Sequence, residues 1–392
     1  MNKQIFELAK KENKPFYIFD TNRLYNRIDR IKSFLPEDTG ICYAVKANTF
    51  IIKEIYPKVD RMEICSPGEA GICNKLGIDS ECQVISGIYK TPDFIESIFK
   101  SGNFEGIFTV ESVEQFRLLD EFSKKYKKQT KILLRLTNNS QFGMDKETIE
   151  KLISELIASD SLLHLVGLQY FSGTQKTSIK KYERELAMLD DFIDELKERY
   201  SYVPEELEYG TGFPVAYFEG ESFDEDELFT KFAALLRNLR YKGKIILEIG
   251  RSIAASCGYY FTNIVDVKSN KRQNYIITDG GMHQITYYGQ SMAMKRPVIS
   301  ILGTKTPSDG KAWNICGSLC TMNDLMAKEI PLGDVNIGDT LCFENAGAYC
   351  MTEGIALFLS RDLPGVFILD KEGTILKVRS GFETEKLNCP NY

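Results

Sequence analysis

Histidine is scarce in this chain, whose 392 residues include two, His164 and His283. That scarcity argues against a histidine-centred catalytic triad or metal site. Cysteine is more frequent, with ten residues, but no two of them form a C-x-x-C pair, so neither a zinc site nor a disulfide framework is indicated. No apolar run approaches the roughly 18 residues that a membrane-spanning helix needs. We therefore expect neither a metal centre nor a membrane span.

An excess of positive charge is also missing. The formal net charge is -6 at pH 7 and the sequence pI is about 5.4, which argues against nucleic acid as a partner. Residues 1–14 mix charged and apolar side chains and lack the apolar segment of a signal peptide. We expect a cytoplasmic protein. The length of 392 residues favours two domains, and a hydrophobic content of 43% supports a full core.

Short apolar segments alternate with amphipathic ones between residues 40 and 251. Eight segments are predicted as strands, at residues 41–45, 62–65, 83–86, 106–110, 131–136, 166–171, 207–209 and 244–249. Apolar residues at three- and four-residue spacing predict helices, most clearly at 113–126, 147–159, 179–200 and 224–240. Eight β/α repeats favour a closed parallel (β/α)8 TIM barrel over an open doubly wound sheet. We assign this barrel to residues 20–255.

After Arg251 the predicted strands follow one another without helices between them. They lie at residues 259–267, 275–278, 297–302, 312–316, 340–344 and 365–378, the last with a hairpin turn at Glu372-Gly373. This pattern predicts an antiparallel β-rich second domain. We assign it residues 256–392 together with residues 1–19, which include an early strand at 15–19.

Lys46 stands at the end of the first barrel strand, in the run Tyr43-Ala44-Val45-Lys46-Ala47-Asn48. In barrels of this kind the chemistry lies at the carboxyl ends of the strands. A lysine held there in a partly desolvated site can form a Schiff base with a carbonyl. The alternative for a lone lysine is an ordinary surface residue, and the other strand ends favour the reactive lysine.

Two of these strand ends predict an anion site. Gly210-Thr211-Gly212 opens a loop whose bare backbone can approach an anion closely, although a simple turn also explains the motif. Arg251 follows at the next strand end beside Gly250 and offers a bidentate fork for phosphate. Because barrels of this type frequently bind phosphate in the loops after their last two strands, we expect a phosphate group there.

Four more strand-end residues complete the candidate site. Glu248 is suited to face a protonated pyridine nitrogen, whose cationic ring acts as an electron sink; the alternative is a buried carboxylate with a structural partner. Phe171 can stack on such a ring, or it is a core aromatic. Glu63 and Arg135 lie near the ends of the second and fifth strands, and we expect both at the cofactor.

One cysteine of the second domain differs in its setting from the other nine. Cys320 lies among glycine and serine rather than in an apolar segment. Free cysteine usually behaves as a small buried apolar residue, which remains the alternative for Cys320. We interpret the other nine cysteines in that way.

Six motifs, in this order along the chain, resemble those of the fold-type III pyridoxal phosphate decarboxylases, which include diaminopimelate, ornithine and arginine decarboxylases. The motifs are the Lys46 run, Ser66-Pro67-Gly68-Glu69, Gly210-Thr211-Gly212-Phe213-Pro214, Glu248-Ile249-Gly250-Arg251 with Ile249 in place of a proline, Gly317-Ser318-Leu319-Cys320 and Gly347-Ala348-Tyr349. The resemblance implies pyridoxal 5'-phosphate on Lys46, an alanine-racemase-like barrel and a C-terminal β-domain. It also implies a head-to-tail homodimer, in which Cys320 of one subunit completes the active site of the other and Tyr349 contacts phosphate.

Departures from the family pattern concern the substrate. Phe171 replaces a ring-stacking histidine, Thr321 replaces a glutamate of diaminopimelate decarboxylases, and residues 279–287 lack the arginine that holds a distal carboxylate. Asp279-Gly280-Gly281-Met282-His283, Cys320-Thr321 and Gln141-Phe142-Gly143-Met144-Asp145 instead resemble the subgroup that decarboxylates glutamyl groups on an acyl carrier protein. We expect Tyr287, Thr321 and Asp324 to contact the substrate.

The leading hypothesis is a lyase, an amino-acid decarboxylase in which Lys46 holds the cofactor and Cys320 or a nearby group reprotonates the α-carbon. Its substrate is a free amino acid, other than diaminopimelate, or a carrier-tethered amino acyl group. An amino-acid racemase on the same barrel is an alternative, which the Gly-x-x-Cys and Gly-Ala-Tyr motifs disfavour. A non-catalytic homologue is another, which the intact Lys46, Glu248 and Arg251 disfavour.

Overall fold

The computed structural model describes residues 2–303 and 310–390 of the chain. The chain divides into two units, each with its own internal contacts. The barrel unit comprises Ile28–Pro214 and Asp224–Ser252, and the sheet unit comprises Met1–Arg27, Val215–Phe223 and Ile253–Tyr392. The domain ranges expected from the sequence, 20–255 and 1–19 with 256–392, stay a prediction.

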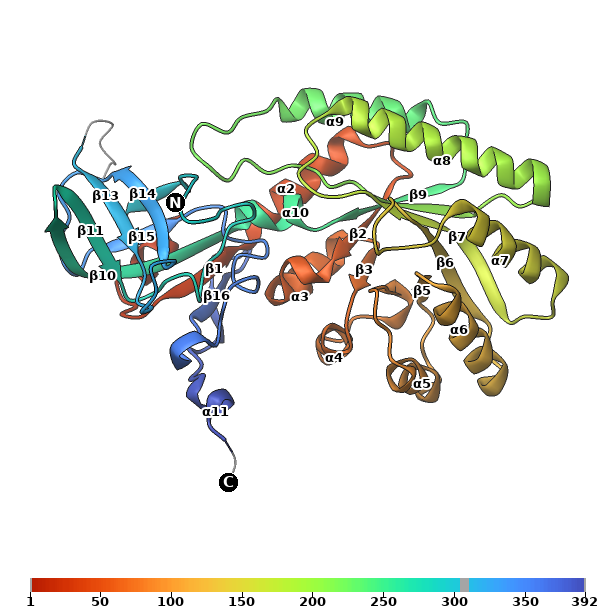
Figure 1. Cartoon of the computed structure of the whole chain (residues 1–392), viewed down its shortest axis with the longest axis horizontal. Helices are drawn as coiled ribbons and strands as arrows, with labels where there is room; N and C mark the ends of the chain where they lie inside the picture. Colours follow the sequence, from red (N-terminus) through yellow and green to blue (C-terminus); the bar gives the residue numbers. More distant parts are fainter. Residues whose placement is uncertain (1, 304–309, 391–392) are drawn as a thin grey trace. The chain divides into compact units, whose positions relative to one another are not determined.

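Eight parallel strands of the barrel unit close on themselves (Figure 1). They are β2 (Gly40–Ala44), β3 (Arg61–Ile64), β4 (Gln83–Ile85), β5 (Ile107–Val110), β6 (Thr130–Leu136), β7 (Leu163–Phe171), β8 (Glu206–Gly210) and β9 (Lys244–Ile249). β9 completes the closure by pairing with β2, with Glu248 opposite Cys42. All five residues of β2 are buried, as expected where helices cover the outer face of a parallel sheet. The predicted (β/α)8 barrel is confirmed.

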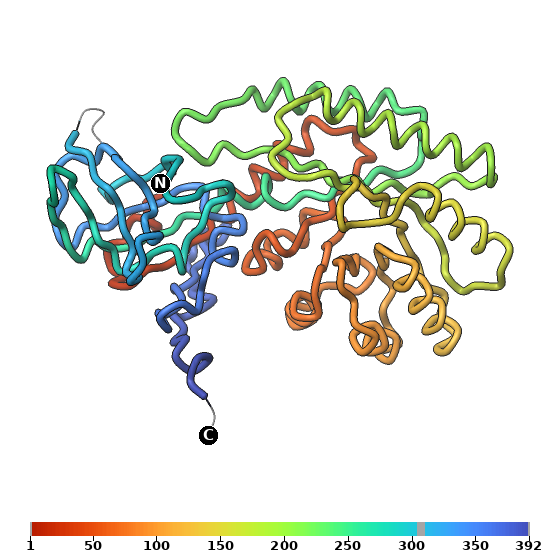
Figure 2. Tube along the Cα trace, in the orientation of Figure 1, coloured from red at the N-terminus to blue at the C-terminus, as the bar shows by residue number. Residues whose placement is uncertain are grey.

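Helices connect the barrel strands and cover them. They are α2 (Thr21–Phe34), α3 (Ile52–Ile55), α4 (Pro67–Lys75), α5 (Pro92–Ser101), α6 (Val113–Tyr126), α7 (Lys146–Ala158), α8 (Ile179–Tyr200), α9 (Glu225–Arg237) and α10 (Arg251–Ala254). Side-chain caps begin several of them: Ser112 accepts a hydrogen bond from the N–H of Gln115 at the start of α6. The bounds of α6 and α8 are those predicted, and α8 and α9 run side by side (Figure 2).

The barrel interior is packed rather than hollow. Side chains from six of its strands form one buried apolar cluster, made of Cys42, Val84, Ile107, Leu133, Val166 and Ile246. A filled interior separates the two ends of the barrel and leaves the carboxyl ends of the strands to carry polar groups. The polar residues predicted from the sequence therefore have one common location in this unit.

The sheet unit is built on a nine-stranded sheet. Its strands are β1 (Phe16–Asp20), β10 (Gly258–Asn270), β11 (Gln273–Thr278), β12 (Ile299–Ile301), β13 (Ala312–Cys316), β14 (Leu325–Pro331), β15 (Thr340–Phe343), β16 (Gly365–Leu369) and β17 (Ile375–Arg379). The main order is β14-β13-β11-β10-β1-β16-β17, and β15 pairs with both β10 and β12. Hence the expected C-terminal β-domain is confirmed.

Three details of the sheet unit differ from the sequence prediction. The pairs β1–β16 and β11–β13 are parallel, because strands far apart in the chain are not restricted to antiparallel hairpin pairing. The strand β14 and two short helices, α1 (Lys3–Ala9) and α11 (Glu385–Asn388), were not predicted. β14 was missed because its burial does not alternate strictly along the strand.

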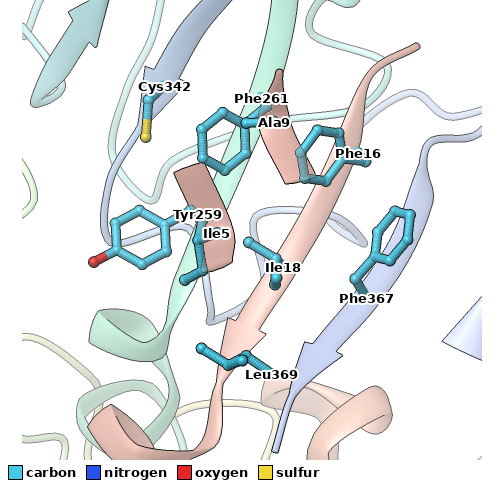
Figure 3. Packing of buried hydrophobic residues seen from close by; sticks show 9 residues of the cluster. All are labelled: Ile5, Ala9, Phe16, Ile18, Tyr259, Phe261, Cys342, Phe367 and Leu369. Atoms are coloured by element: carbon cyan, nitrogen blue, oxygen red, sulfur yellow. The ribbon is translucent and has the colours of Figure 1, made fainter. Parts of the chain in front are cut away.

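A cluster of buried side chains in the sheet unit joins α1, near the start of the chain, to the strands β1, β10, β15 and β16 (Figure 3). Ile5 and Ala9 on α1 pack against Phe16 and Ile18 on β1 and against Phe367 and Leu369 on β16. The rings of Phe16 and Phe261 stack with centroids 4.8 Å apart. Burial of these side chains is the main stabilisation of this sheet, at about 1.5–3 kcal/mol for each large apolar residue.

Among the helices in residues 2–303 and 310–390, none combines the length and the hydropathy that crossing a membrane requires.

Candidate active site

Lys46 lies just beyond the carboxyl end of β2, on a short 3-10 turn, Val45–Ala47. Two hydrogen bonds to Asn48, directly after the turn, hold it in place. The hydroxyl of Tyr43 donates to the backbone oxygen of Asn48 at 3.1 Å, and the side chain of Asn48 accepts from the N–H of Phe50 at 2.9 Å. These contacts fix where the lysine leaves the backbone at the end of the barrel.

Two carboxylates and a thiol surround the Lys46 ammonium. β2 lies between β3 and β9, and the strand register places Glu63 beside Ala44 and Glu248 beside Cys42. Lys46 Nζ is hydrogen-bonded to Glu63 Oε2 and lies 3.6 Å from Glu248 Oε1. Closed-barrel pairing therefore brings together a cation and two anions that are 17 and 202 residues apart in the chain.

Burial affects the two carboxyl groups in opposite ways. Burial alone raises the pKa of Glu63, but the Lys46 ammonium and the Cys65 thiol outweigh it, so the pKa of Glu63 is lowered. For Glu248, burial and the charge on Glu63 raise the pKa to about 6, against the opposing effect of Lys46 and Arg135. Glu63 is therefore a fixed anion, while Glu248 can share a proton near neutral pH.

Side-chain hydrogen bonds from other parts of the barrel hold Glu248 and Arg135 in place. Gln169 on β7 donates to Glu248 Oε2 at 3.0 Å, and Arg135 on β6 donates to Glu111 Oε1 at 2.8 Å. Within the described residues, Arg135 Nε is buried without a hydrogen-bond partner. A buried guanidinium N–H without a partner is costly, and it is suited to an anionic or polar ligand at this end of the barrel.

The predicted anion loop follows β8. Gly212 has φ +58°, and a Cβ there would lie 2.1 Å from the backbone oxygen of Gly173, so only glycine fits. At Gly210 a Cβ would lie 2.4 Å from Cδ2 of Phe171, which places the Phe171 ring directly against this loop. Thr211 is fully buried, and its N–H donates to the backbone oxygen of Glu248 at 3.2 Å.

Arg251 begins α10 directly after Gly250, at the end of β9. Its side chain is 8% exposed, and its Nε donates to Thr174 Oγ1 at 3.2 Å. The guanidinium thereby connects the loop after β7 with the loop after β9. The phosphate-binding role of Arg251 stays a prediction.

The sequence analysis missed three residues at this end of the barrel: Cys65, Glu111 and Gln169. Gln169 lies two residues before Phe171 on the same face of β7, a spacing that could have identified it. Cys65 directly follows β3, and its Sγ lies 3.1 Å from Glu63 Oε1 and 3.5 Å from Lys46 Nζ. Only the fold reveals these contacts.

The prediction that nine cysteines are small buried residues is therefore wrong in part. Five are buried: Cys42, Cys73, Cys257, Cys342 and Cys350. Cys65, Cys82 and Cys316 are half-buried, and Cys389 is exposed. Burial and the Glu63 charge raise the pKa of the Cys65 thiol well above its ordinary value. The thiol therefore keeps its proton and donates a hydrogen bond to Glu63 Oε1.

The remaining predicted residues lie in the sheet unit. Cys320 is exposed and Thr321 is half-buried, in the turn between β13 and β14. Asp324 is 3% exposed, and its two oxygens accept backbone N–H bonds from Met282 and Leu319, each at 2.7 Å. Asp324 thus joins the segments after β11 and β13, which leaves substrate contact by this residue as a prediction.

Tyr287 is held by the backbone of the sheet unit, and Tyr349 has an uncommon backbone conformation. The Tyr287 hydroxyl donates to the backbone oxygen of Glu344 at 2.6 Å, and its ring packs edge-on against Tyr217 with centroids 5.6 Å apart. Tyr349 is half-buried with φ +63°, an uncommon conformation for a residue with a side chain. Such strain is often found at functional positions.

The residues of the barrel unit fit pyridoxal phosphate. Lys46 supplies an amine for the aldehyde, and Glu248 supplies a carboxyl group for the ring nitrogen. Gly212 supplies backbone that a ligand can approach closely, and Arg251 supplies a cation for phosphate. The donors and acceptors of this set match the functional groups of that cofactor.

Comparison with known proteins gives a consistent result. A family model described as "Pyridoxal-dependent decarboxylase, C-terminal sheet domain" matches residues 16–347. The chain is 25% identical to the L-glutamyl-[BtrI acyl-carrier protein] decarboxylase of Niallia circulans, over 96% of this chain and 93% of that protein. It is also 25% identical to the diaminopimelate decarboxylase of Methanocaldococcus jannaschii, over 94% of this chain and 89% of the other.

A solved structure shows the same fold. Diaminopimelate decarboxylase from Helicobacter pylori complexed with L-lysine superimposes with a TM-score of 0.84 and covers 97% of both chains. Sequence identity in that comparison is 22%, so it supports the architecture alone.

Proposed function

The chain belongs to the pyridoxal-dependent decarboxylase family and is a pyridoxal phosphate-dependent lyase acting on amino acids, and we propose that its substrate is an α-amino acyl compound other than free diaminopimelate. The observation that carries the catalytic assignment is the contact of Lys46 with Glu63 and Glu248 at the carboxyl ends of the barrel strands. This lysine is the attachment point for the cofactor.

Bound pyridoxal phosphate supplies an electron sink for the pair of electrons released when the α-carboxylate leaves. Glu248 would face the ring nitrogen of the bound cofactor and hold a proton there, for which a carboxyl with a pKa of about 6 is suited. Glu63 keeps the Lys46 side chain at the strand end through their hydrogen bond. The Gly210–Gly212 loop and Arg251 bind the phosphate.

Two further roles belong to side chains of different units. Phe171, against Gly210, provides an apolar face for the ring. Cys320, exposed in the sheet unit, provides the proton for the α-carbon in the partner subunit of a homodimer. In this proposal the active sites are shared between two copies of the chain.

The substrate proposal rests on the predicted substrate positions Tyr287, Thr321 and Asp324, which, within the part of the chain that the structure describes, offer no free carboxylate for a distal ammonium. Thr321 is uncharged, and both carboxylate oxygens of Asp324 already accept backbone N–H bonds. Burial lowers the pKa of His283 to about 4, so this residue is neutral at physiological pH. These positions favour an amino acid whose far end carries no ammonium group.

An amino acyl group tethered to a carrier through its distal carboxyl meets that requirement, because attachment there leaves the α-amino group and the α-carboxylate free for the reaction. The relative from Niallia circulans is named for an L-glutamyl group on an acyl carrier protein. The second candidate is a free amino acid with an uncharged side chain. The identity of 25% to that relative and to a diaminopimelate decarboxylase does not favour one candidate over the other.

The deciding experiment measures carbon dioxide release by the pyridoxal phosphate-loaded protein. Single free amino acids, diaminopimelate and glutamyl groups loaded on acyl carrier proteins are supplied as separate substrates. We expect release from carrier-tethered substrate and none from diaminopimelate. Release from diaminopimelate at the highest rate would overturn the proposal, whereas racemisation without carbon dioxide release would favour the racemase alternative.

A further inference from the structure

A buried polar cluster lies behind the Gly210–Gly212 loop. Its four members are Ser172 in the loop after β7, Lys176 further along that loop, Glu185 on α8 and Tyr209 on β8. The side chain of Lys176 is 1% exposed and that of Glu185 is 8% exposed. An ammonium this deeply buried requires compensating contacts, and the cluster provides them.

The contacts form a closed network. Lys176 Nζ donates to Glu185 Oε2 at 2.9 Å, to the Tyr209 hydroxyl at 3.1 Å and to Ser172 Oγ at 3.3 Å. Glu185 also accepts hydrogen bonds of 2.5 Å from the hydroxyls of Ser172 and Tyr209. The ammonium further lies 4.7 Å from the ring centroid of Tyr182. A fully satisfied network of this kind orders the segments that it joins.

Lys176 also binds the backbone of the anion loop directly. Its N–H donates to the backbone oxygen of Gly212 at 2.9 Å, and its Nζ lies 3.4 Å from the backbone oxygen of Gly210. Two carbonyl groups of the loop are therefore turned towards Lys176. In a planar trans peptide the C=O and the following N–H point in opposite directions, so the N–H groups of Thr211 and Phe213 point away from Lys176. They donate to the backbone oxygen of Glu248 and to Thr211 Oγ1, so both sides of these peptide units are held in place.

Burying the ion pair of Lys176 and Glu185 costs desolvation free energy. Burial lowers the pKa of Lys176 to about 8, although the charge and hydrogen bond of Glu185 act against that effect. An apolar pair of similar volume often stabilises a fold as well as a buried ion pair does. Packing alone therefore does not account for Lys176 and Glu185 at this position.

We propose that Lys176 and Glu185 are positioning residues for the cofactor phosphate. Lys176 holds the carbonyl oxygens of Gly210 and Gly212 on the inner side of the loop, and it thereby fixes the backbone conformation of the loop that the anion meets. Glu185 fixes the orientation of Lys176. This inference rests on the proposed placement of phosphate at this loop and Arg251.

The test compares binding of pyridoxal phosphate with binding of pyridoxal, which has the same ring and aldehyde but no phosphate. Dissociation constants are measured spectroscopically on apoprotein prepared from wild type, Lys176→Met and Glu185→Gln. We expect Lys176→Met to weaken pyridoxal phosphate binding about 10- to 100-fold, the range for loss of an outer supporting contact. Pyridoxal binding should change less than about threefold. Glu185→Gln should also weaken pyridoxal phosphate binding, but by a smaller factor than Lys176→Met.

Lys90→Met is the matched control. Lys90 is another buried lysine of the barrel unit, 6% exposed, and it donates to the backbone oxygen of Gly87 and to Gln115. This variant should leave the ratio of the two dissociation constants unchanged. Equal weakening of both ligands in Lys176→Met would mean that Lys176 serves the fold alone, and it would overturn the proposal.

Arg251→Met separates this inference from the proposed function. If Arg251→Met keeps the wild-type preference for pyridoxal phosphate, the phosphate has been placed wrongly. If Arg251→Met loses the preference and Lys176→Met keeps it, the positioning role is wrong and the phosphate site stands.

Should Lys176→Met not fold, Tyr209→Phe removes only the hydroxyl that contacts Lys176 and Glu185. An unchanged ratio in that variant overturns the proposal, and a drop of about threefold supports it.

Discussion

Glu248 Oε1 lies 3.6 Å from Lys46 Nζ. The other oxygen of Glu248 accepts a hydrogen bond from Gln169, and Glu63 is hydrogen-bonded to the same lysine. Two carboxyl groups therefore share one ammonium, but burial raises the pKa of Glu248 while that of Glu63 is lowered. This asymmetry assigns the fixed charge to Glu63 and the shared proton to Glu248, and it leads to the following predictions.

Reduction of the loaded protein with borohydride should attach the cofactor permanently to Lys46. The reason is that Lys46 is the lysine at the strand ends beside Glu63 and Glu248. Mass spectrometry of peptides should find the added mass on Lys46 and not on the buried lysines Lys90 and Lys176. The added mass on either of those lysines, or on none, would contradict the assignment.

Glu248→Gln should retain bound cofactor and lose about 100-fold or more in turnover, because an amide cannot keep a proton on the ring nitrogen. Glu208→Gln is the matched control. Glu208 is fully buried on the neighbouring strand, and burial and the Glu248 charge raise its pKa well above the ordinary value. Burial disfavours the charged form of Glu208, so its amide should change turnover less than about twofold. Undiminished turnover in Glu248→Gln would leave Glu248 a structural role only.

Mixing inactive Lys46→Ala with inactive Cys320→Ala should restore part of the activity. If Cys320 acts in the partner's site, each mixed dimer has one site without either substitution. With random exchange about half of the dimers are mixed, so about a quarter of native activity is the upper expectation. Native mass spectrometry checks that subunits exchange. If they do and no activity returns, Cys320 acts within its own subunit.

Stability should fall in acid because of His283. This residue is 1% exposed, and within the described residues its Nδ1 has no hydrogen-bond partner. Burial, with a contribution from Arg361, lowers its pKa from 6.5 to about 4. Between those values the unfolded chain binds a proton that the folded chain does not. Stability is therefore lost as the pH falls from 6.5 towards 4, at up to about 1.4 kcal/mol per pH unit and roughly 3 kcal/mol in all.

The measurement is urea unfolding of wild type, His283→Gln and His164→Gln across that pH range. The carboxyl groups also titrate there, so the difference between wild type and His283→Gln isolates the histidine. His283→Gln should lose this part of the pH dependence, and His164→Gln should keep it. Parallel curves for wild type and His283→Gln would show that His283 is protonated in the folded protein.

Much of the barrel could be predicted because its signals are local. The helix at 179–200 repeats apolar residues with the period of a helix, and α8 has those bounds. Lys46, Glu248 and Arg251 are recognisable because each follows or ends an apolar strand, and the parallel direction of the strands brings their ends together. Length, composition and periodicity were therefore enough to identify the barrel and to predict where the chemistry lies.

Only the tertiary structure decided which groups touch and what charge they carry. Gln169 lies 79 residues from Glu248, and Lys176 is tied to the loop that follows β8, so no periodic pattern in the sequence records either contact. The opposite pKa shifts of Glu63 and Glu248 depend on how each is buried and on their common neighbour Lys46. Periodicity reports which face of an element is apolar, whereas contacts and proton affinities depend on the closure of the barrel, which brings distant strands side by side.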